Sequence, residues 1–165
     1  KSGIVLPSLL HGGEQERGMR SGTENVPAIA AMALALKMNR EEREKDRTHI
    51  LELKKYLISR LEEIEGIRFN GRCTDNGRSI PSIVRITLPI KKDPSMVLLS
   101  LDMKGVCVSA GSACMAGAVR ESFVIGTLYG DNNTMKGMPT LRISMGKWNV
   151  KEEIDIAVEA IRALF

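Results

Sequence analysis

The chain has 165 residues, of which 43% are hydrophobic and 27% charged, a composition typical of an ordered globular protein. The net charge of +4 comes from basic residues interleaved with acidic ones, and only 4% of residues are aromatic, so a nucleic-acid-binding surface is not expected. No apolar run approaches the ~18–20 residues that cross a membrane, and three cysteines, an odd number, favour a reducing compartment such as the cytoplasm over a disulfide framework.

The segment before Pro27 is rich in glycine and polar residues and shows neither a helical nor a strand period. The chain begins at Lys1 without an initiator methionine or a hydrophobic leader, which indicates a fragment or a processed piece. Glycines allow backbone N–H groups to approach an anion. Two interpretations stay open for the polar residues of this segment. They form either a phosphate- or carboxylate-binding loop or a surface loop with a few ion pairs; the residues are Arg17, Arg20, Ser21 and Thr23.

A helix is expected to begin after Asn25, which can cap it, with Pro27 in its first turn. The helical pattern runs through Ala28–Lys37 and becomes highly charged, and we place a candidate domain boundary in Asn39–Arg47. Beyond it, apolar residues recur every three or four positions and form one stripe that ends before Gly66: Ile50, Leu53, Leu57, Leu61 and Ile64.

The remaining elements alternate between short strands and helices. Strands are predicted at Ile67–Asn70, Ile80–Leu88, Val106–Val108 and Leu141–Met145, and helices at Ser95–Lys104, at Glu121–Tyr129 and after Asn149. Asn149 and Glu152 form a capping-box-like start to the last helix, whose expected buried stripe is Ile154, Ala157, Val158, Ile161 and Leu164. This order predicts a two-layer α/β (α+β) unit in which helices cover a small sheet.

Alternation in the strand Leu141–Met145 places Leu141, Ile143 and Met145 on one face and Arg142 on the other. One face therefore packs on the core while the arginine projects away from it. A guanidinium holds a carboxylate through two parallel hydrogen bonds, which makes Arg142 the best anion-binding candidate outside the N-terminal loop. An ordinary surface arginine fits the same pattern equally well.

Cys114 lies in a run of small residues that follows the expected strand Val106–Val108. Small neighbours leave a thiol accessible, and accessibility governs its reactivity as much as its pKa does. We therefore predict that Cys114 is a nucleophile carried by a mobile loop, whereas Cys107, inside the apolar strand, is predicted to be a buried structural cysteine. The spacing of cysteines and histidines contains no metal-binding pattern, so no metal site is expected.

Three motifs together resemble the cysteine desulfurases, fold-type I pyridoxal-phosphate enzymes of the class V aminotransferase group. They are His11–Asn25, Ser109–Cys114, and Leu141–Gly146 followed by Glu152–Asp155, and their order and spacing agree with the family over almost the whole chain. The Gly-Ser-Ala-Cys form looks like the subgroup with a long mobile catalytic loop, which supplies sulfur for iron–sulfur cluster assembly and tRNA thiolation. One departure is Glu14, where a third glycine is usual.

The resemblance implies roles for three residues. Cys114 corresponds to the nucleophile that takes sulfur from L-cysteine and becomes a persulfide, which leaves L-alanine. Arg142 corresponds to the arginine that binds the substrate carboxylate, and Thr23 to the threonine that reaches the cofactor phosphate of the other subunit in a homodimer. The implied cofactor, pyridoxal phosphate, weakens the substrate C–S bond by acting as an electron sink. The implied protein partner is a sulfur acceptor or an iron–sulfur scaffold protein.

The family's cofactor lysine, in a Ser-x-His-Lys context, does not occur in this sequence. We therefore expect a C-terminal portion that is inactive alone: residues 1–45 as the tail of the PLP-binding large domain, and residues 46–165 as the small C-terminal domain with the cysteine loop. No membrane or direct nucleic-acid partner is expected. Two alternatives stay open. The first is another class V enzyme, an aminotransferase or a selenocysteine lyase, for which the need for Cys114 is the discriminator, since transamination would not require it. The second is a stand-alone sulfur-carrier or interaction module, whose start codon would lie close to Lys1.

Overall fold

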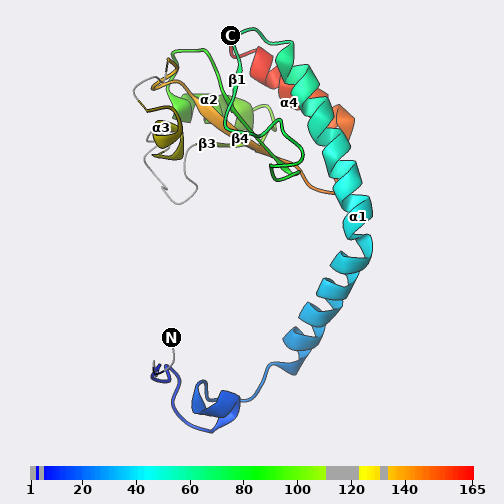
Figure 1. Cartoon of the computed structure of the whole chain (residues 1–165), viewed down its shortest axis with the longest axis vertical. Helices are drawn as coiled ribbons and strands as arrows, with labels where there is room; N and C mark the ends of the chain where they lie inside the picture. The colour runs from blue at the N-terminus through cyan, green and yellow to red at the C-terminus, as the bar shows by residue number, and fades with distance from the viewer. Residues whose placement is uncertain (1–2, 4–5, 111–122, 131–133) are drawn as a thin grey trace. The chain divides into compact units, whose positions relative to one another are not determined.

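The computed structural model describes residues 3, 6–110, 123–130 and 134–165 of the chain (Figure 1). By their internal contacts the residues form two compact units, Lys1–Arg43 and Glu44–Phe165. Helix α1 (Val26–Glu62) contributes residues to both units, and the division falls inside the charged segment Asn39–Arg47 of this helix. The charged segment is helical throughout, as part of α1. Its side chains are exposed or half-buried, so their charges do not disturb the helix.

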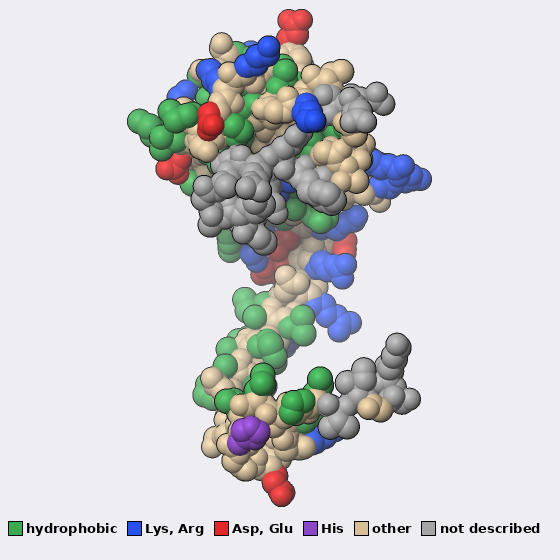
Figure 2. Space-filling view, turned by 90° about the vertical axis from the view of Figure 1, so that its left-hand side faces the viewer, with side chains coloured by type: hydrophobic (Ala, Val, Ile, Leu, Met, Phe, Trp, Pro, Cys, Tyr) green, Lys and Arg blue, Asp and Glu red, His purple; other side chains and the backbone are tan. Residues whose placement is uncertain are grey.

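The first unit contains a glycine-rich loop with a short 3-10 turn, η1 (Gln15–Gly18), and the N-terminal part of α1. Asn25 caps this helix as predicted, because its Oδ1 accepts a hydrogen bond from the backbone N–H of Ala28 at 3.1 Å. Hydrophobic side chains gather along the N-terminal part of the helix (Figure 2). Six of them are exposed to solvent: Val26, Ile29, Met32, Leu34, Leu36 and Met38. This part of the helix therefore carries exposed apolar side chains that the described first unit does not cover.

The second unit is an antiparallel sheet in the order β1–β2–β4–β3, with helices packed on it (Figure 1). Its strands are β1 (Arg68–Phe69), β2 (Ile83–Thr87), β3 (Ser109–Ala110) and β4 (Thr140–Ser144). Its helices are the C-terminal part of α1, α2 (Pro94–Asp102), α3 (Phe123–Tyr129) and α4 (Lys151–Arg162). The predicted α+β class, a small sheet covered by helices, is confirmed.

The core lies between one face of the sheet and the helices α1, α2 and α4. Strands contribute alternate residues to it and helices one stripe each, as the periodicities of strand and helix require. The stripes predicted on α1 and α4 are buried except at Ile50 and Ala157, which are half-buried, and Leu141 and Ile143 of β4 point into the same core. The members with almost no exposed surface are Leu53, Leu57, Leu61, Val84, Ile86, Leu88, Val97, Leu101, Leu141, Val158 and Ile161.

Two predictions about secondary structure and capping are wrong. Val106–Val108 is not a strand, because among the described residues around it Ser109 and Ala110, and not these three, pair with β4. The carboxylate that caps α4 belongs to Glu153 and not to Glu152: it accepts hydrogen bonds from the Val150 backbone N–H at 3.1 Å and from Asn149 Nδ2 at 2.9 Å. Both hydrogen bonds lower the pKa of Glu153, the one from the Asn149 side chain more than the one from the Val150 backbone.

Lys54 on α1 is fully buried. Its ammonium donates hydrogen bonds to Ser79 Oγ at 2.7 Å and to the Ile80 carbonyl at 3.0 Å, which ties the helix to the chain segment before β2. Burial lowers the pKa of Lys54, an effect that Cys73 and Asp75 partly oppose. In the pH range between the lowered pKa and the ordinary value of about 10.4, the unfolded chain therefore binds more protons than the folded chain.

We expect the free energy of unfolding to rise as the pH increases through this range, because deprotonation removes the cost of a buried charge. In the variant Lys54→Met this rise should be absent, whereas Lys55→Met, which changes the exposed neighbour on the same helix, should keep it. The measurement is guanidinium-induced unfolding between pH 7.5 and 10. An unchanged pH slope in Lys54→Met would contradict the assignment.

Candidate functional site

The face of the sheet that points away from the core carries guanidinium groups. In β2 the side chains of Val84 and Ile86 point into the core, so Arg85 between them points to the opposite face. Arg142 of β4 is the direct cross-strand partner of Arg85 and therefore shares that face. Register also places Arg68 of β1 and Ser109 of β3 there, because they pair with Thr87 and Arg142. We call these four residues, Arg68, Arg85, Arg142 and Ser109, the arginine face.

Arg142 lies at the centre of this face and is half-buried. Its Nη2 donates a long hydrogen bond of 3.3 Å to Ser109 Oγ. Its Nε is buried and has no hydrogen-bond partner among the described residues. A buried guanidinium N–H normally has a partner, and a carboxylate suits the planar arrangement of these donors. The prediction that Arg142 projects away from the core is confirmed, and the face it occupies suits an anionic ligand.

Two further arginines lie on this face, and sequence reasoning did not single them out. Burial, followed by the nearby charge of Arg142, lowers the pKa of Arg85, its cross-strand neighbour. Arg68 is held over the ring of Tyr129 on α3, with its guanidinium carbon 4.1 Å from the ring centroid. Alternation in β2 could have placed Arg85 outward, but its register against β4 is not visible in local sequence.

Strand β3 connects the arginine face to the sequence that contains Cys114. Ser109 and Ala110 pair with Arg142 and Leu141 of β4. Ala110 is also the last described residue before the segment 111–122, and Cys114 lies outside the described residues. The structure therefore places the start of the cysteine segment next to Arg142 and leaves the position of the predicted nucleophile as a prediction.

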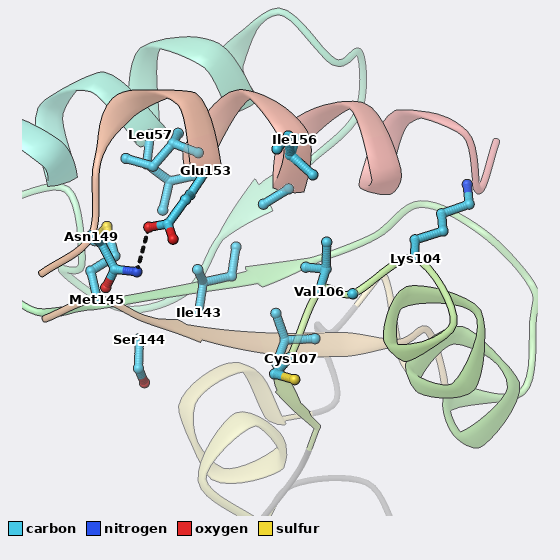
Figure 3. A pocket seen from close by; sticks show the side chains of 14 residues that line it. Leu57, Lys104, Val106, Cys107, Ile143, Ser144, Met145, Asn149, Glu153 and Ile156 are labelled. Carbon is cyan, nitrogen blue, oxygen red and sulfur yellow. Dashed lines mark hydrogen bonds between the residues drawn. The ribbon is translucent and has the colours of Figure 1, made fainter.

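Cys107 is exposed, so its prediction as a buried structural cysteine is wrong. Val106 is buried and Val108 packs against the core, whereas Cys107 between them is exposed. Figure 3 shows the Cys107 sulfur directed away from α4, and this sulfur lies 3.9 Å from Asp102 Oδ1. The buried cysteine in the described chain is Cys73, whose thiol donates to the Arg85 carbonyl at 3.4 Å.

A cavity of about 490 Å³ lies on the other side of the sheet, between α4 and the strands (Figure 3). Glu153 and Ile156 of α4 point into it, and Val106 and Ile143 form its floor. Its lining is mainly apolar and includes none of the three arginines. The cavity is therefore separate from the arginine face.

Thr23 belongs to the first unit and is exposed, two residues before the cap of α1. Hydrogen bonds within the loop hold the chain around it: Ser21 Oγ donates to the Gly13 carbonyl at 2.6 Å, and the Gly22 N–H donates to Gln15 Oε1 at 3.1 Å. Arg20 forms an ion pair with Glu24 and is thus engaged within the loop. An exposed hydroxyl next to a helix N-terminus suits a phosphate. The hydroxyl provides a hydrogen-bond donor, and the helix N-terminus provides backbone N–H donors and positive potential. Thr23 and Arg142 lie in different units.

Comparison with known proteins shows the family of the chain. The model of the aminotransferase class-V family matches residues 7–156. The putative cysteine desulfurase IscS 1 of Bacillus subtilis is 36% identical over 160 residues, which are 96% of this chain and 41% of that protein. The cysteine desulfurase IscS of Photobacterium profundum is 34% identical over 162 residues, 98% of this chain and 38% of that protein.

Among solved structures, the NifS-like protein of Rickettsia africae is similar with a TM-score of 0.73 and 26% identity, over 98% of this chain and 40% of that one. The chain thus spans about two fifths of the length of the relatives it matches. The match to the family model extends over both compact units and includes Thr23, Cys114 and Arg142. The chain belongs to the class-V aminotransferase family.

Proposed function

We propose that the chain is part of a pyridoxal-phosphate-dependent cysteine desulfurase, which converts L-cysteine to L-alanine and collects the sulfur as a persulfide on Cys114. The observation that carries this proposal is the position of Arg142. Its half-buried side chain, with a buried Nε that has no partner among the described residues, lies beside the strand that precedes the Cys114 segment in the sequence. The similarity to curated cysteine desulfurases over 96–98% of the chain supports the same reaction.

In this proposal Arg142 binds the substrate carboxylate and so fixes one end of L-cysteine at the arginine face. A bidentate guanidinium–carboxylate pair sets the orientation of the ligand as well as its affinity. The Cys114 thiolate attacks the substrate sulfur at the other end. A sulfur–sulfur bond forms as the Cβ–S bond breaks, and a proton delivered to the substrate carbon completes L-alanine.

Pyridoxal phosphate, when bound, supplies the electron sink that makes the substrate C–S bond breakable. Thr23 fits a contact to its phosphate, because the hydroxyl is exposed next to the N-terminus of α1. By the family resemblance this phosphate belongs to the cofactor of the partner subunit. Lys54 does not fit the role of the cofactor lysine, since its ammonium is buried and bonded to Ser79 and Ile80.

The large PLP-binding domain is proposed to supply that lysine and to cover the exposed apolar side chains of α1 in the first unit. Six exposed apolar side chains between Val26 and Met38 support a contact of this kind. The complete enzyme is proposed to be a cytoplasmic homodimer that passes sulfur to an acceptor or iron–sulfur scaffold protein. This proposal leaves residues 1–45 as the tail of the large domain and residues 46–165 as the small domain.

The experiment adds L-cysteine to the full-length, cofactor-loaded protein and maps persulfide by mass spectrometry over Cys73, Cys107 and Cys114. We expect persulfide on Cys114 with release of L-alanine, and loss of both in Cys114→Ser. Cys107 is an internal control, because its thiol is exposed and it lies seven residues before Cys114 in the chain. Alanine without sulfur on Cys114, or equal labelling of Cys107, would contradict the role of Cys114. Loaded enzyme without turnover would favour another class V reaction.

A further inference from the structure

Arg85 and Arg142 face each other across the two central strands of the sheet. They are direct Cα partners in the antiparallel register of β2 and β4, and alternation turns both side chains to the arginine face. Both residues are half-buried. Like charges directly opposite each other destabilise a sheet, and the low local dielectric of a half-buried face strengthens their repulsion. A bound anion between the two guanidinium groups would turn this repulsion into attraction.

We propose that Arg85 is a second carboxylate-binding residue, which holds the same substrate carboxylate as Arg142; this inference rests on the proposed function. A carboxylate offers about four lone-pair sites, and one guanidinium occupies two of them in the bidentate arrangement. The second guanidinium donates to the remaining sites. Two arginines at fixed positions then restrict rotation about the bond between the carboxylate and the substrate Cα, which directs the substrate sulfur in one direction.

The surroundings of Arg142 support this assignment. On the β3 side its neighbour is Ser109, whose neutral hydroxyl accepts one long hydrogen bond of 3.3 Å. On the β2 side its neighbour is Arg85, and burial together with the charge of Arg142 lowers the pKa of that arginine. The space beside Arg142 on the β2 side is therefore the more positive one, and a carboxylate bound there contacts both arginines.

Arg68 provides the matched control within the same face. Arg68 lies in β1 and pairs with Thr87 of β2, so it is not a cross-strand neighbour of Arg142. Its guanidinium is stacked on Tyr129 at 4.1 Å, which keeps its charge over the aromatic ring. If positive charge on the arginine face acts only in a general way, replacing Arg68 or Arg85 should weaken carboxylate binding equally. If Arg85 contacts the carboxylate directly, replacing Arg85 should weaken binding more.

The test uses the full-length, cofactor-loaded enzyme and the change in cofactor absorption when a ligand binds. The ligands are L-alanine, which carries the carboxylate, and ethylamine, which lacks it. We expect Arg85→Gln to weaken L-alanine binding about tenfold, the effect of losing one charge-assisted hydrogen bond, and to leave ethylamine binding unchanged. The L-alanine affinity of Arg85→Lys should lie between those of the wild type and Arg85→Gln, since lysine keeps the charge without the planar donors. Arg68→Gln removes one charge from the same face without removing a cross-strand neighbour of Arg142, so it should weaken L-alanine binding less than Arg85→Gln does.

Unchanged binding of L-alanine in Arg85→Gln, with a tenfold or greater loss in Arg142→Gln, would overturn the inference alone. An equal loss for both ligands would show a structural effect and would also overturn it. Unchanged L-alanine binding in both variants would overturn the proposed function together with the inference. If Arg85→Gln does not fold, Arg85→Lys decides the question, because wild-type affinity for L-alanine in that variant would contradict a direct contact.

Discussion

Replacement of Arg142 by glutamine is expected to raise the KM of the full-length enzyme for L-cysteine about 100-fold or more. The substrate carboxylate loses two charge-assisted hydrogen bonds, each worth roughly 1.5–3 kcal/mol. Each ~1.4 kcal/mol corresponds to a factor of ten in binding. The loss is large because Arg142 is the central residue of the arginine face, between Ser109 and Arg85, and its Nε is buried. Steady-state kinetics together with L-alanine titration measure the effect.

Two control variants separate the effect of the planar guanidinium donors from that of the positive charge. Arg142→Lys should give an intermediate KM, because lysine keeps the charge but lacks the planar pair of donors. Arg162→Gln removes an arginine from the surface of α4, where its Nη2 lies 3.2 Å from Glu63 in an exposed ion pair. Such pairs contribute little, so this variant should behave as the wild type. A KM for Arg142→Gln within about threefold of the wild-type value would exclude Arg142 from the carboxylate site.

Truncation of Leu141 to alanine is expected to lower the free energy of unfolding by about 2–5 kcal/mol. Leu141 has no exposed surface and points into the core from β4, a central strand of the sheet. The lost side chain leaves both a transfer cost and a cavity between the sheet and its helices. Guanidinium-induced unfolding followed by circular dichroism measures the change.

Ser144→Ala is the matched control on the same strand. Ser144 is exposed and points to the face opposite the core, so its removal should change the free energy of unfolding by less than about 0.5 kcal/mol. A loss below about 1 kcal/mol in Leu141→Ala would mean that the core around β4 closes over the missing side chain.

Local periodicity accounts for the parts of the fold that could be predicted. The alternation of Leu141, Arg142 and Ile143 assigned each side chain to its face. The helix predicted from Ser95 begins within one residue of that position, where the Asp93 side chain accepts a hydrogen bond from the Ser95 N–H at 2.8 Å. In both cases the information lies within a few residues. The family resemblance added the residue roles that no local pattern contains.

Errors arose where a structure depends on a distant partner. An apolar run such as Val106–Val108 shows that side chains are buried, but a strand also needs a neighbour for its backbone, and in this part of the chain β4 pairs with Ser109 and Ala110. The same reason explains Cys107, whose direction depends on which of its neighbours meets the core. The opposition of Arg85 and Arg142 depends on the register between two strands far apart in sequence, which no local motif encodes.

The two ends of the proposed site are held by strands of unequal stability. β4 is paired on both sides, with five residues of β2 and two of β3, so the backbone of Arg142 sits among the amides whose hydrogen exchange requires the sheet to come apart. β3 is a two-residue edge strand, and its amides can exchange through local opening at a much lower free energy. The backbone of Arg142, the proposed carboxylate end of the site, is thus expected to exchange its amide hydrogens more slowly than Ser109 and Ala110 of β3, which precede the Cys114 segment in the sequence.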